Sequence, residues 1–279
     1  MSTMPDRDFI FTDNDFNNIR ALVKSHTGIS LSEAKKNMVY SRLSRRLRSL
    51  ELKTFKEYCN IIESGDSSEL VNFTNSITTN LTAFFRENHH FEFLKNTAIP
   101  EVIKKNSDTR KIKIWCCASS TGEEPYSIAM TVLESLPKNQ TWDIKITATD
   151  LDTNVLKTAK EGIYSEERIN GIDKKRIKKW FWKGKGKHEG MAMVAPELKN
   201  LISFRQANLL EKWPDEGPFD IVFCRNVVIY FDKPTQRILF ERIANSLRDD
   251  SYLLIGHSES LFKVSDRFKL IGNTIYKKI

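Results

Sequence analysis

The stretch KIKIWCCASSTGEEPYSIAM, residues 111–130, decides the fold of this chain. It begins with a short hydrophobic strand over 112–117, continues through a turn of small residues, and enters a helix whose first turn carries Glu123, Glu124 and Pro125. A strand, a tight turn and a helix in that order form the first crossover of a parallel α/β sheet, in which nucleotide-like ligands bind at the carboxyl end of the strand. The stretch therefore predicts both the fold class and the place of a binding site.

The two glutamates of this turn restrict the kind of ligand. A phosphate-binding turn uses bare amides and Lys or Arg, because carboxylates repel phosphate. Glu123 and Glu124 instead suit a positively charged ligand. S-adenosylmethionine (SAM) carries a sulfonium and an ammonium group and no phosphate, and it is the cofactor that this turn predicts.

The composition is that of an ordinary globular protein. The chain has 279 residues, of which 40% are hydrophobic and 29% charged. No apolar run approaches the roughly 18 residues of a membrane helix, and the N-terminus has no signal pattern, so we expect a cytoplasmic protein without membrane insertion. The four cysteines show no CxxC spacing, which predicts buried thiols rather than a zinc site or disulfides, and we expect no metal.

The net charge of +8 is concentrated in two segments. Between Arg20 and Arg48 there are eight basic residues and one acidic residue, Glu33. Between Asp173 and Lys187 there are eight more basic residues against Asp173 alone. Such patches indicate an acidic partner, which could be a nucleic acid or an acidic protein surface.

Two domains are predicted. Residues 1–77 read as an all-helical domain in which Thr12-Asp13 caps the first helix, and residues 78–279 read as a doubly wound α/β domain.

Candidate strands cover 112–117, 144–149, 202–206, 221–224 and 252–256, and 267–271 with 274–278 form a closing antiparallel hairpin. Candidate helices cover 125–136, 154–161 and 234–247. This arrangement is common among SAM-dependent methyltransferases. A glycine-rich segment with flanking aromatics, near 176–200, predicts a small antiparallel β insertion.

Polar residues follow several of the predicted strands. Asp150 closes the second strand, roughly 20–30 residues after the first, where a carboxylate typically accepts the ribose hydroxyls of an adenosine ligand. Asn208 and Leu209 follow another strand, where a polar loop could bind the adenine edge. Arg225 and Asn226, and then Tyr230, follow the next strand and could face the ligand or the substrate. The alternative for these last three is helix capping and surface packing.

The segment TTNLTAFFRENHHF, residues 78–91, precedes the sheet. Asn80, Thr82 and Arg86 are interleaved with an apolar pair, and an arginine in such a segment can pair with a carboxylate of the cofactor or of the substrate. His89 and His90 could be acid–base groups, but paired histidines at a helix start are more often structural.

These segments carry a family resemblance. TTNLTAFFRENHHF, WCCASSTGEEPYSIAM, ATDLD, NLLE and FCRNVVIYFDK occur here in the order in which they occur in the chemotaxis receptor methyltransferases, the CheR-type family. The resemblance covers nearly the whole chain, and STGEEPYS and the CRNVxIYF pattern are not general features of methyltransferases. The glycine-rich signature of many methyltransferases is absent, since only Gly122 follows the first strand.

The resemblance implies an activity and a set of site residues. The implied activity is methyl transfer from SAM to glutamate side chains on the cytoplasmic helices of bacterial chemoreceptors, with S-adenosylhomocysteine (SAH) as product. Arg86 and Tyr230 would lie nearest the reacting end, as the catalytic residues. The choice between Glu123 and Glu124 as the ligand contact stays open. The implied cofactor contacts are Asn80, Thr82, Arg86, Glu124, Asp150, Asn208, Leu209, Arg225 and Asn226.

The chemistry of this reaction agrees with the motifs. A glutamate with an ordinary pKa of about 4.3 is ionised at neutral pH, so it needs no general base to attack the methyl group. The enzyme must align three atoms in a dry site, which is catalysis by proximity and orientation. No Ser–His or similar catalytic set stands out in the sequence, as this reaction allows.

The resemblance also suggests partners. Basic residues at helical spacing could steer the protein onto glutamate-rich receptor helices, or they could be an ordinary solvated face. These residues are Lys35, Arg42, Arg45 and Arg46. The insertion, with Gly184, Gly186 and Gly190, resembles the family segment that in some members docks a receptor C-terminal tail peptide by strand addition. We expect a monomer recruited to membrane receptor arrays, without a nucleic-acid partner.

Three other classes fit the sequence less well. Amino-methylating nucleic-acid methyltransferases usually carry an Asn/Asp-Pro-Pro-aromatic motif, whereas this chain has Arg-Asn-Val-Val at residues 225–228. A non-catalytic adaptor would not need Arg86, Glu124, Asp150 and Tyr230 together. A nicotinamide dehydrogenase would carry GxGxxG after the first strand, and this chain does not.

Overall fold

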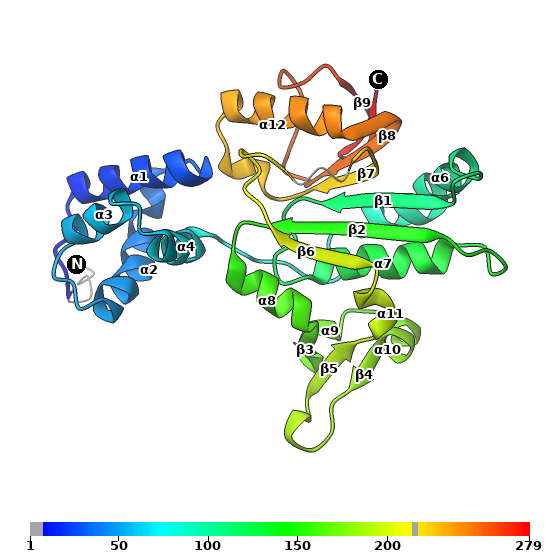
Figure 1. Ribbon diagram of the computed structural model, residues 1–279, viewed down its shortest axis with the longest axis horizontal. Coiled ribbons are helices and arrows are strands. Elements are labelled where there is room, and N and C mark those ends of the chain that lie inside the picture. The colour runs from blue at the N-terminus through cyan, green and yellow to red at the C-terminus, as the bar shows by residue number, and fades with distance from the viewer. Residues whose placement is uncertain (1–7, 214–216) are drawn as a thin grey trace, which may run out of the picture. The chain divides into compact units, whose positions relative to one another are not determined.

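The computed structural model describes residues 8–213 and 217–279, which form two compact units (Figure 1). One unit comprises residues 1–79 together with Tyr230–Asp232, and the other comprises residues 80–229 and 233–279. The first seven residues of the expected helical domain, and residues 214–216 of the expected catalytic domain, lie outside the described residues. Each unit is described by itself below.

The first unit is helical, as the sequence predicts. Its elements are α1 (Asp13–Thr27), η1 (Glu33–Lys35), α2 (Lys36–Ser49), α3 (Phe55–Glu63) and α4 (Ser67–Ile77). Thr12 caps α1 through a reciprocal pair of hydrogen bonds with Asp15, and the helix ends at Gly28, whose φ of +74° is a left-handed conformation that glycine adopts without strain. Apolar residues spaced three and four apart on these helices form one core, which includes Phe16, Leu43 and Tyr58.

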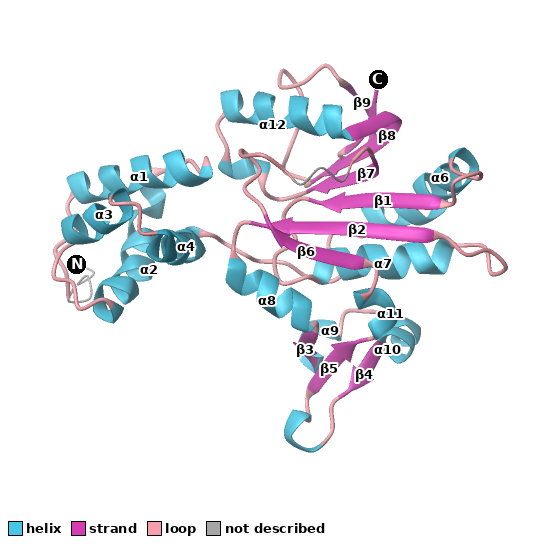
Figure 2. Cartoon of the chain, viewed as in Figure 1, coloured by secondary structure: helices cyan, strands magenta, loops and turns pink. Residues whose placement is uncertain are grey.

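The second unit contains a seven-stranded sheet in the order β6-β2-β1-β7-β8-β10-β9 (Figure 2). All neighbouring strands are parallel except β10, which pairs antiparallel with both β8 and β9. This confirms the predicted doubly wound sheet with an antiparallel edge. The strands are β1 (Lys111–Cys116), β2 (Asp143–Asp150), β6 (Ile202–Gln206), β7 (Phe219–Cys224), β8 (Leu247–Ile255), β9 (Phe268–Gly272) and β10 (Ile275–Lys278).

Helices cover both faces of this sheet. They are α5 (His89–Phe93), which continues through the π-helical turn η2 (Leu94–Ala98) into α6 (Ile99–Lys105), then α7 (Glu123–Ser135), α8 (Thr153–Glu161), η4 (Val228–Tyr230) and α12 (Lys233–Ser246). Strand β1 alternates, so Ile112, Ile114 and Cys116 join α6 and α7 in one core cluster. Helix α12 packs beside β8 (Figure 1). The paired histidines mark the start of α5, as expected, whereas its continuation to Lys105 is not among the predicted helices.

The insertion is a three-stranded antiparallel sheet in the order β3-β5-β4. It comprises β3 (Ile163–Ser165), α9 (Glu166–Ile169), α10 (Lys174–Trp180), β4 (Phe181–Lys183), η3 (Gly186–His188), β5 (Met191–Val194) and α11 (Pro196–Lys199). A small antiparallel sheet is therefore confirmed. The insertion begins earlier than residue 176, because its first strand, β3, directly follows α8. A strand as short as β3 produces no recognisable pattern in the sequence.

Candidate active site

The carboxyl ends of β1, β2 and β7 meet at one edge of the sheet, because these strands are parallel and adjacent. The chain runs from β1 to β2 on one side and returns to β7 on the other, so the crevice between β1 and β7 is the switch point at which such sheets bind ligands. The turn after β1, Asp150 at the end of β2, and Arg225 after β7 all lie at this edge. The structure thus brings the three predicted segments together.

The turn between β1 and α7 is held tightly. Ser119 N donates to Thr149 O at 2.9 Å, which ties the turn to β2. Gly122 has φ +100°, and a β carbon there would lie 2.7 Å from Tyr164 Oη and 2.9 Å from Ala159 Cβ. Only glycine fits this position. The buried hydroxyl oxygen of Ser119 has no hydrogen-bond partner, which leaves the turn with unused polar capacity.

Asp150 is built to receive hydroxyl donors. One carboxylate oxygen accepts Ser120 N at 2.8 Å and the other accepts Asp152 N at 3.0 Å, and the backbone N–H of Leu151 also acts on this carboxylate. Asp152 caps α8 through Asn154 N, as the sequence predicts, and its second oxygen accepts Asn80 Nδ2 at 2.7 Å. Burial raises the pKa of Asp150 to about 6. A carboxylate has about four acceptor positions, so Asp150 keeps acceptor capacity for a ribose hydroxyl, and this residue fits SAM.

Arg225 is the centre of a buried ion-pair cluster. Its side chain, 1% exposed, pairs with Glu124 and, at 3.1 Å, with Glu87. The same guanidinium donates to the backbone carbonyl of Arg86 at 2.6 Å. Cys116 Sγ donates to the other oxygen of Glu124 at 3.2 Å. Two carboxylates around one arginine leave this cluster with a net negative charge, which suits a cationic ligand.

The two glutamates of the first turn have different partners. Glu123 is fully buried, accepts Thr121 Oγ1 at 2.7 Å and pairs with Arg168 of α9 in the insertion. Glu124 lies in the Arg225 cluster. The geometry therefore makes Glu124, rather than Glu123, the glutamate of this turn that belongs to the candidate site.

Arg86 lies on the loop that precedes α5. Its Nη1 donates to Leu81 O at 3.0 Å, so the side chain folds back over its own loop. This loop reaches the Asp150 side of the edge through Asn80, whose backbone carbonyl accepts Ser120 Oγ at 2.8 Å. Thr82 lies on the same loop and is partly exposed.

The remaining predicted contacts lie on the loops after β6 and β7. Asn208 Oδ1 accepts Leu210 N at 3.0 Å and Leu209 is buried, so their loop has a defined turn. Asn226 Nδ2 donates to Glu87 at 3.3 Å. Tyr230 falls in the helical unit, where its carbonyl accepts Ser30 N at 2.8 Å. The catalytic role of Tyr230 stays a prediction.

Sequence reasoning missed three residues of this site. Glu87 pairs with Arg225, and His257 Nδ1 lies 2.9 Å from Glu87. Glu259 is buried and accepts the backbone N–H groups of Asn226, Val228, Ile229 and Gly256, which fixes the loop after β7. Burial raises the pKa of Glu259, while the four N–H groups act against that rise. The run GHSES directly after a buried strand, residues 256–260, was the signal that could have revealed two of them.

One cluster at this edge has ligand types that metals use. Glu87, His89 and His90 place ligand atoms within 4.8 Å of one another. Arg225 already lies against Glu87, and its charge would oppose a cation there. Burial, with the charge of Arg225, lowers the pKa of His90 to about 3, so this imidazole is neutral. The expected absence of a metal stays a prediction.

The basic residues of α2 have unequal surroundings. Arg42 donates to the carbonyls of Ile77 and Thr78 at the end of α4, at 2.9 and 2.6 Å. Arg46 pairs with the buried Glu69 at 2.6 Å. Lys35 and Arg45 are exposed. Only these last two present their charge mainly to solvent, so the four basic residues do not form one uniform surface.

The three glycines of the insertion shape its β4–β5 turn. A β carbon on Gly184 would lie 1.9 Å from His188 O, and Gly186 and Gly190 have positive φ. Receptor contact by these glycines stays a prediction.

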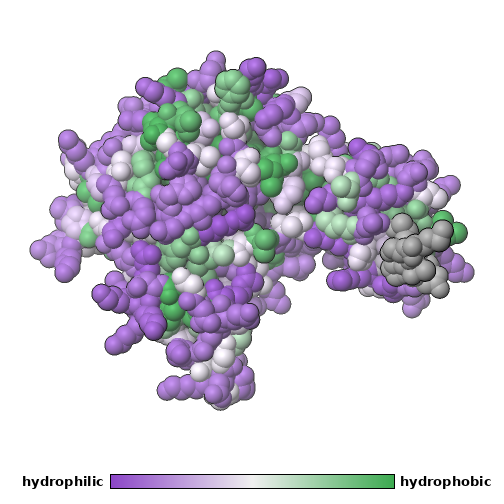
Figure 3. All heavy atoms as spheres, turned by 180° about the vertical axis from the view of Figure 1, so that it is seen from behind, coloured by the Kyte–Doolittle hydropathy of each residue, from purple (hydrophilic) through white to green (hydrophobic). Residues whose placement is uncertain are grey.

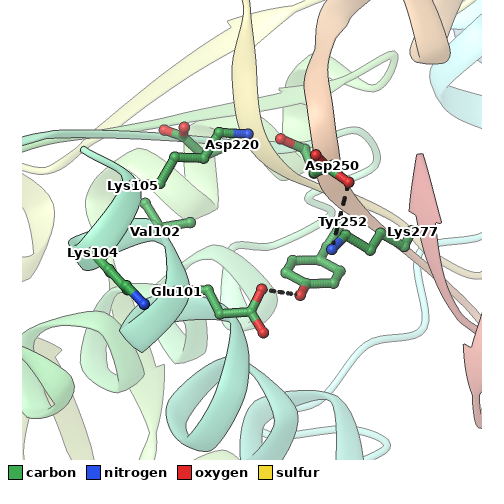
Figure 4. Close-up of a pocket in the computed structure, with 9 residues that line it drawn as sticks. Glu101, Val102, Lys104, Lys105, Asp220, Asp250, Tyr252 and Lys277 are labelled. Atoms are coloured by element: carbon green, nitrogen blue, oxygen red, sulfur yellow. Dashed lines mark hydrogen bonds and ion pairs between the residues drawn. The ribbon is translucent and has the colours of Figure 1, made fainter. Parts of the chain in front are cut away.

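A separate cavity of about 450 Å³ is lined by residues of α6, β7, β8 and β10 (Figure 4). Tyr252 donates to Glu101, Lys277 pairs with Asp250 at 3.6 Å, and Lys105 donates to Asp249 O at 2.6 Å. These charged groups are therefore paired within the protein. It lies away from the carboxyl edge that carries Asp150.

The surface and the helices give two further facts. On the face shown in Figure 3, hydrophilic residues predominate and apolar residues occur in small patches. Within residues 8–213 and 217–279, no helix combines the length and the apolar character that a membrane crossing requires.

Comparison with known proteins covers both units. Residues 80–277 match the family model "CheR methyltransferase, SAM binding domain", and residues 14–78 match "CheR methyltransferase, all-alpha domain". Chemotaxis protein methyltransferase 2 of Pseudomonas aeruginosa is 44% identical over 271 residues, covering 97% of this chain and 95% of that protein. The chemotaxis protein methyltransferase of Escherichia coli K12 is 44% identical over 268 residues, covering 95% of this chain and 91% of that protein.

A third relative agrees with these. The probable chemotaxis protein methyltransferase of Rhizobium etli is 41% identical over 258 residues, covering 92% of this chain and 96% of that protein. Both family models and these three relatives agree with the resemblance seen in the motifs. The chain belongs to the CheR methyltransferase family and carries its SAM-binding domain over residues 80–277.

Proposed function

We propose that this protein transfers the methyl group of SAM to glutamate side chains of bacterial chemoreceptors, forming glutamate methyl esters and releasing SAH. The observation that carries the proposal is Asp150, a buried carboxylate at the carboxyl edge that backbone N–H groups hold in place and that keeps acceptor capacity. The names of the relatives, chemotaxis protein methyltransferases, support methyl transfer in chemotaxis, and the receptor as substrate is our inference. The protein-glutamate specificity is our inference from the chemistry.

The residues of the carboxyl edge divide the binding of SAM among them. Asp150 would accept the ribose hydroxyls, and the loop of Asn208 and Leu209 would hold the adenine. Glu124 and Arg225 would bind the methionine end, since a carboxylate suits its ammonium group and an arginine its carboxylate. Asn80 and Thr82 belong to the loop that reaches Asp150, and Asn226 follows Arg225. When bound, SAM supplies an electrophilic methyl carbon, which a glutamate oxygen attacks as the carbon–sulfur electron pair moves to sulfur.

The protein's task in this reaction is alignment. The attacking glutamate is ionised at neutral pH, so no residue has to remove a proton. Arg86 is the cation of the loop beside the cluster, and it would orient the incoming carboxylate. Tyr230 would assist at the same end. Positioning of this kind can contribute several powers of ten to a rate.

The receptor would be recognised by charge and by a tail peptide. Lys35 and Arg45, which are exposed on the helical unit, would steer the protein onto acidic receptor helices. Arg42 and Arg46 would add to the positive electrostatic potential of the same unit. Among the strands of the described residues, β4 pairs only with β5, and its Trp182 is 50% exposed, so its outer edge could accept a receptor tail as an added strand. The protein would act as a cytoplasmic monomer recruited to receptor arrays.

Calorimetric titration with SAM and SAH tests the proposed site. Micromolar binding that disappears in Asp150→Ala supports it, and receptor fragments would then be examined for base-labile methyl esters. A folded wild type that captures receptor fragments but binds neither SAM nor SAH would favour the second candidate, a non-catalytic adaptor.

A further inference from the structure

We propose that Glu87 is a positioning residue that holds the backbone of Arg86 in a single conformation, with His257 as its solvent-side partner. The inference rests on the proposed function, because it assumes that Arg86 acts at the reacting end. It adds a role for two residues that the motif comparison did not assign.

Arg86 lies between two residues with left-handed backbone conformations. Phe85 has φ +53° and Glu87 has φ +56°. Residues with a β carbon avoid this region, and the conformation is most unusual for a bulky side chain such as Phe. Two such residues around one arginine persist only where the surroundings impose them, and strain of this kind collects at functional sites.

Hydrogen bonds impose the conformation on each of the three residues. Phe85 N donates to Ser127 Oγ at 3.0 Å, which ties the loop to α7. Arg86 O accepts Arg225 Nη2 at 2.6 Å. Glu87 is tied through its side chain, so the loop is fastened immediately before, at and after Arg86.

Glu87 makes the largest number of these contacts. Its carboxylate, 10% exposed, accepts Arg225 Nη2 at 3.1 Å, Asn226 Nδ2 at 3.3 Å and the backbone N of His257 at 3.1 Å, and lies 2.9 Å from His257 Nδ1. Burial acts to raise the pKa of Glu87, but the hydrogen bond from His257 and the charge of Arg225 outweigh it and lower the pKa to about 2. Glu87 is therefore ionised at every physiological pH, and it joins the loops after β7 and β8 to the Arg86 loop.

The fold is expected to tolerate the loss of this carboxylate. Arg225 is also paired with Glu124, so Glu87→Gln does not leave a buried charge without a partner. The two glutamates can then be separated by their effects. Glu124→Gln should weaken SAH binding, whereas Glu87→Gln should leave the binding of SAH, which has no sulfonium charge, nearly unchanged and slow turnover.

The test measures turnover and SAH affinity in matched variants. Glu87→Gln is expected to lower kcat about 100-fold, the cost of a misplaced catalytic group, with the Kd for SAH changed less than about threefold. Glu87→Asp should recover part of this loss, and His257→Ala should lower kcat less than Glu87→Gln does. The control is Glu241→Gln, because Glu241 likewise pairs with an arginine, Arg267, in the same unit but away from the Arg86 loop.

Hydrogen exchange gives a readout that does not depend on activity. The amide of Phe85 should exchange faster in Glu87→Gln than in the wild type, and at the wild-type rate in Glu241→Gln. Normal kcat and unchanged exchange in Glu87→Gln would overturn the inference, as would an equal loss of kcat and SAH affinity. If the wild type itself methylates no receptor fragment, the proposed function fails, while the exchange result still decides whether Glu87 holds the loop.

Discussion

The ionisation of Asp150 should make SAH affinity depend on pH. Burial raises the pKa of this carboxyl to about 6, and the ribose hydroxyls need an ionised acceptor. Roughly nine-tenths of the molecules are then competent at pH 7 and roughly one-tenth at pH 5, since the apparent affinity scales with the competent fraction. The affinity should therefore fall about tenfold between these values as the pH is lowered, which is about 1.4 kcal/mol.

Calorimetric titration with SAH from pH 5 to pH 8 measures this dependence. Asp150→Asn has the same shape but does not titrate, so it should bind more weakly and show no step near pH 6. A wild-type affinity that does not change through this range would refute the reasoning. An identical step in Asp150→Asn would refute it as well, because another group would then be responsible.

The other predictions concern the two units separately. Reversing the exposed charges in Lys35→Glu/Arg45→Glu should raise the KM for receptor about tenfold and leave the Kd for SAH unchanged. These residues would act on the association of the protein with the receptor and not on the binding of SAH. Glu69→Gln should lower the free energy of unfolding by about 3 kcal/mol in urea titrations, since it weakens a buried pair with Arg46. The pKa of Glu69 is lowered, so this stabilisation is present above its ordinary pKa and is lost as the pH falls through the folded-state pKa. Arg86→Ala should reduce kcat severely, by about 100-fold, in the methyl-transfer assay.

Each of these results could contradict its premise. An unchanged KM in the charge-reversal variant would remove Lys35 and Arg45 from receptor recognition. Unaltered stability of Glu69→Gln would mean that the buried carboxylate contributes little to the helical unit. Near-normal turnover of Arg86→Ala would remove this residue from the reacting end and, with it, the reason for holding its loop.

The sequence predicted the sheet and its edge well, because both depend on local patterns. Strand periodicity located β1, β2 and β6, and the turn residues Gly272-Asn273 located the closing hairpin. Asp150 could be predicted because it ends a buried strand. These features need only the residues within one element and its turn.

Residues that act across the fold could not be predicted in this way. Glu87 and Arg225 are far apart in sequence and meet only in the folded chain, where the loop before α5 lies against the residue that follows β7. Arg42 and Arg46 look like any surface cations on a helical face, yet they bind α4 carbonyls and a buried glutamate. Such roles depend on which element packs opposite, and that is a property of the folded chain.

Mass spectrometry of a receptor methylation fragment, incubated with the wild type and SAM, shows whether this protein forms glutamate methyl esters. We expect one added methyl group on specific glutamates, which mild base removes and which is absent with Asp150→Ala. Binding of SAM without modification of any receptor glutamate, or modification that resists base and maps to another residue type, would contradict it.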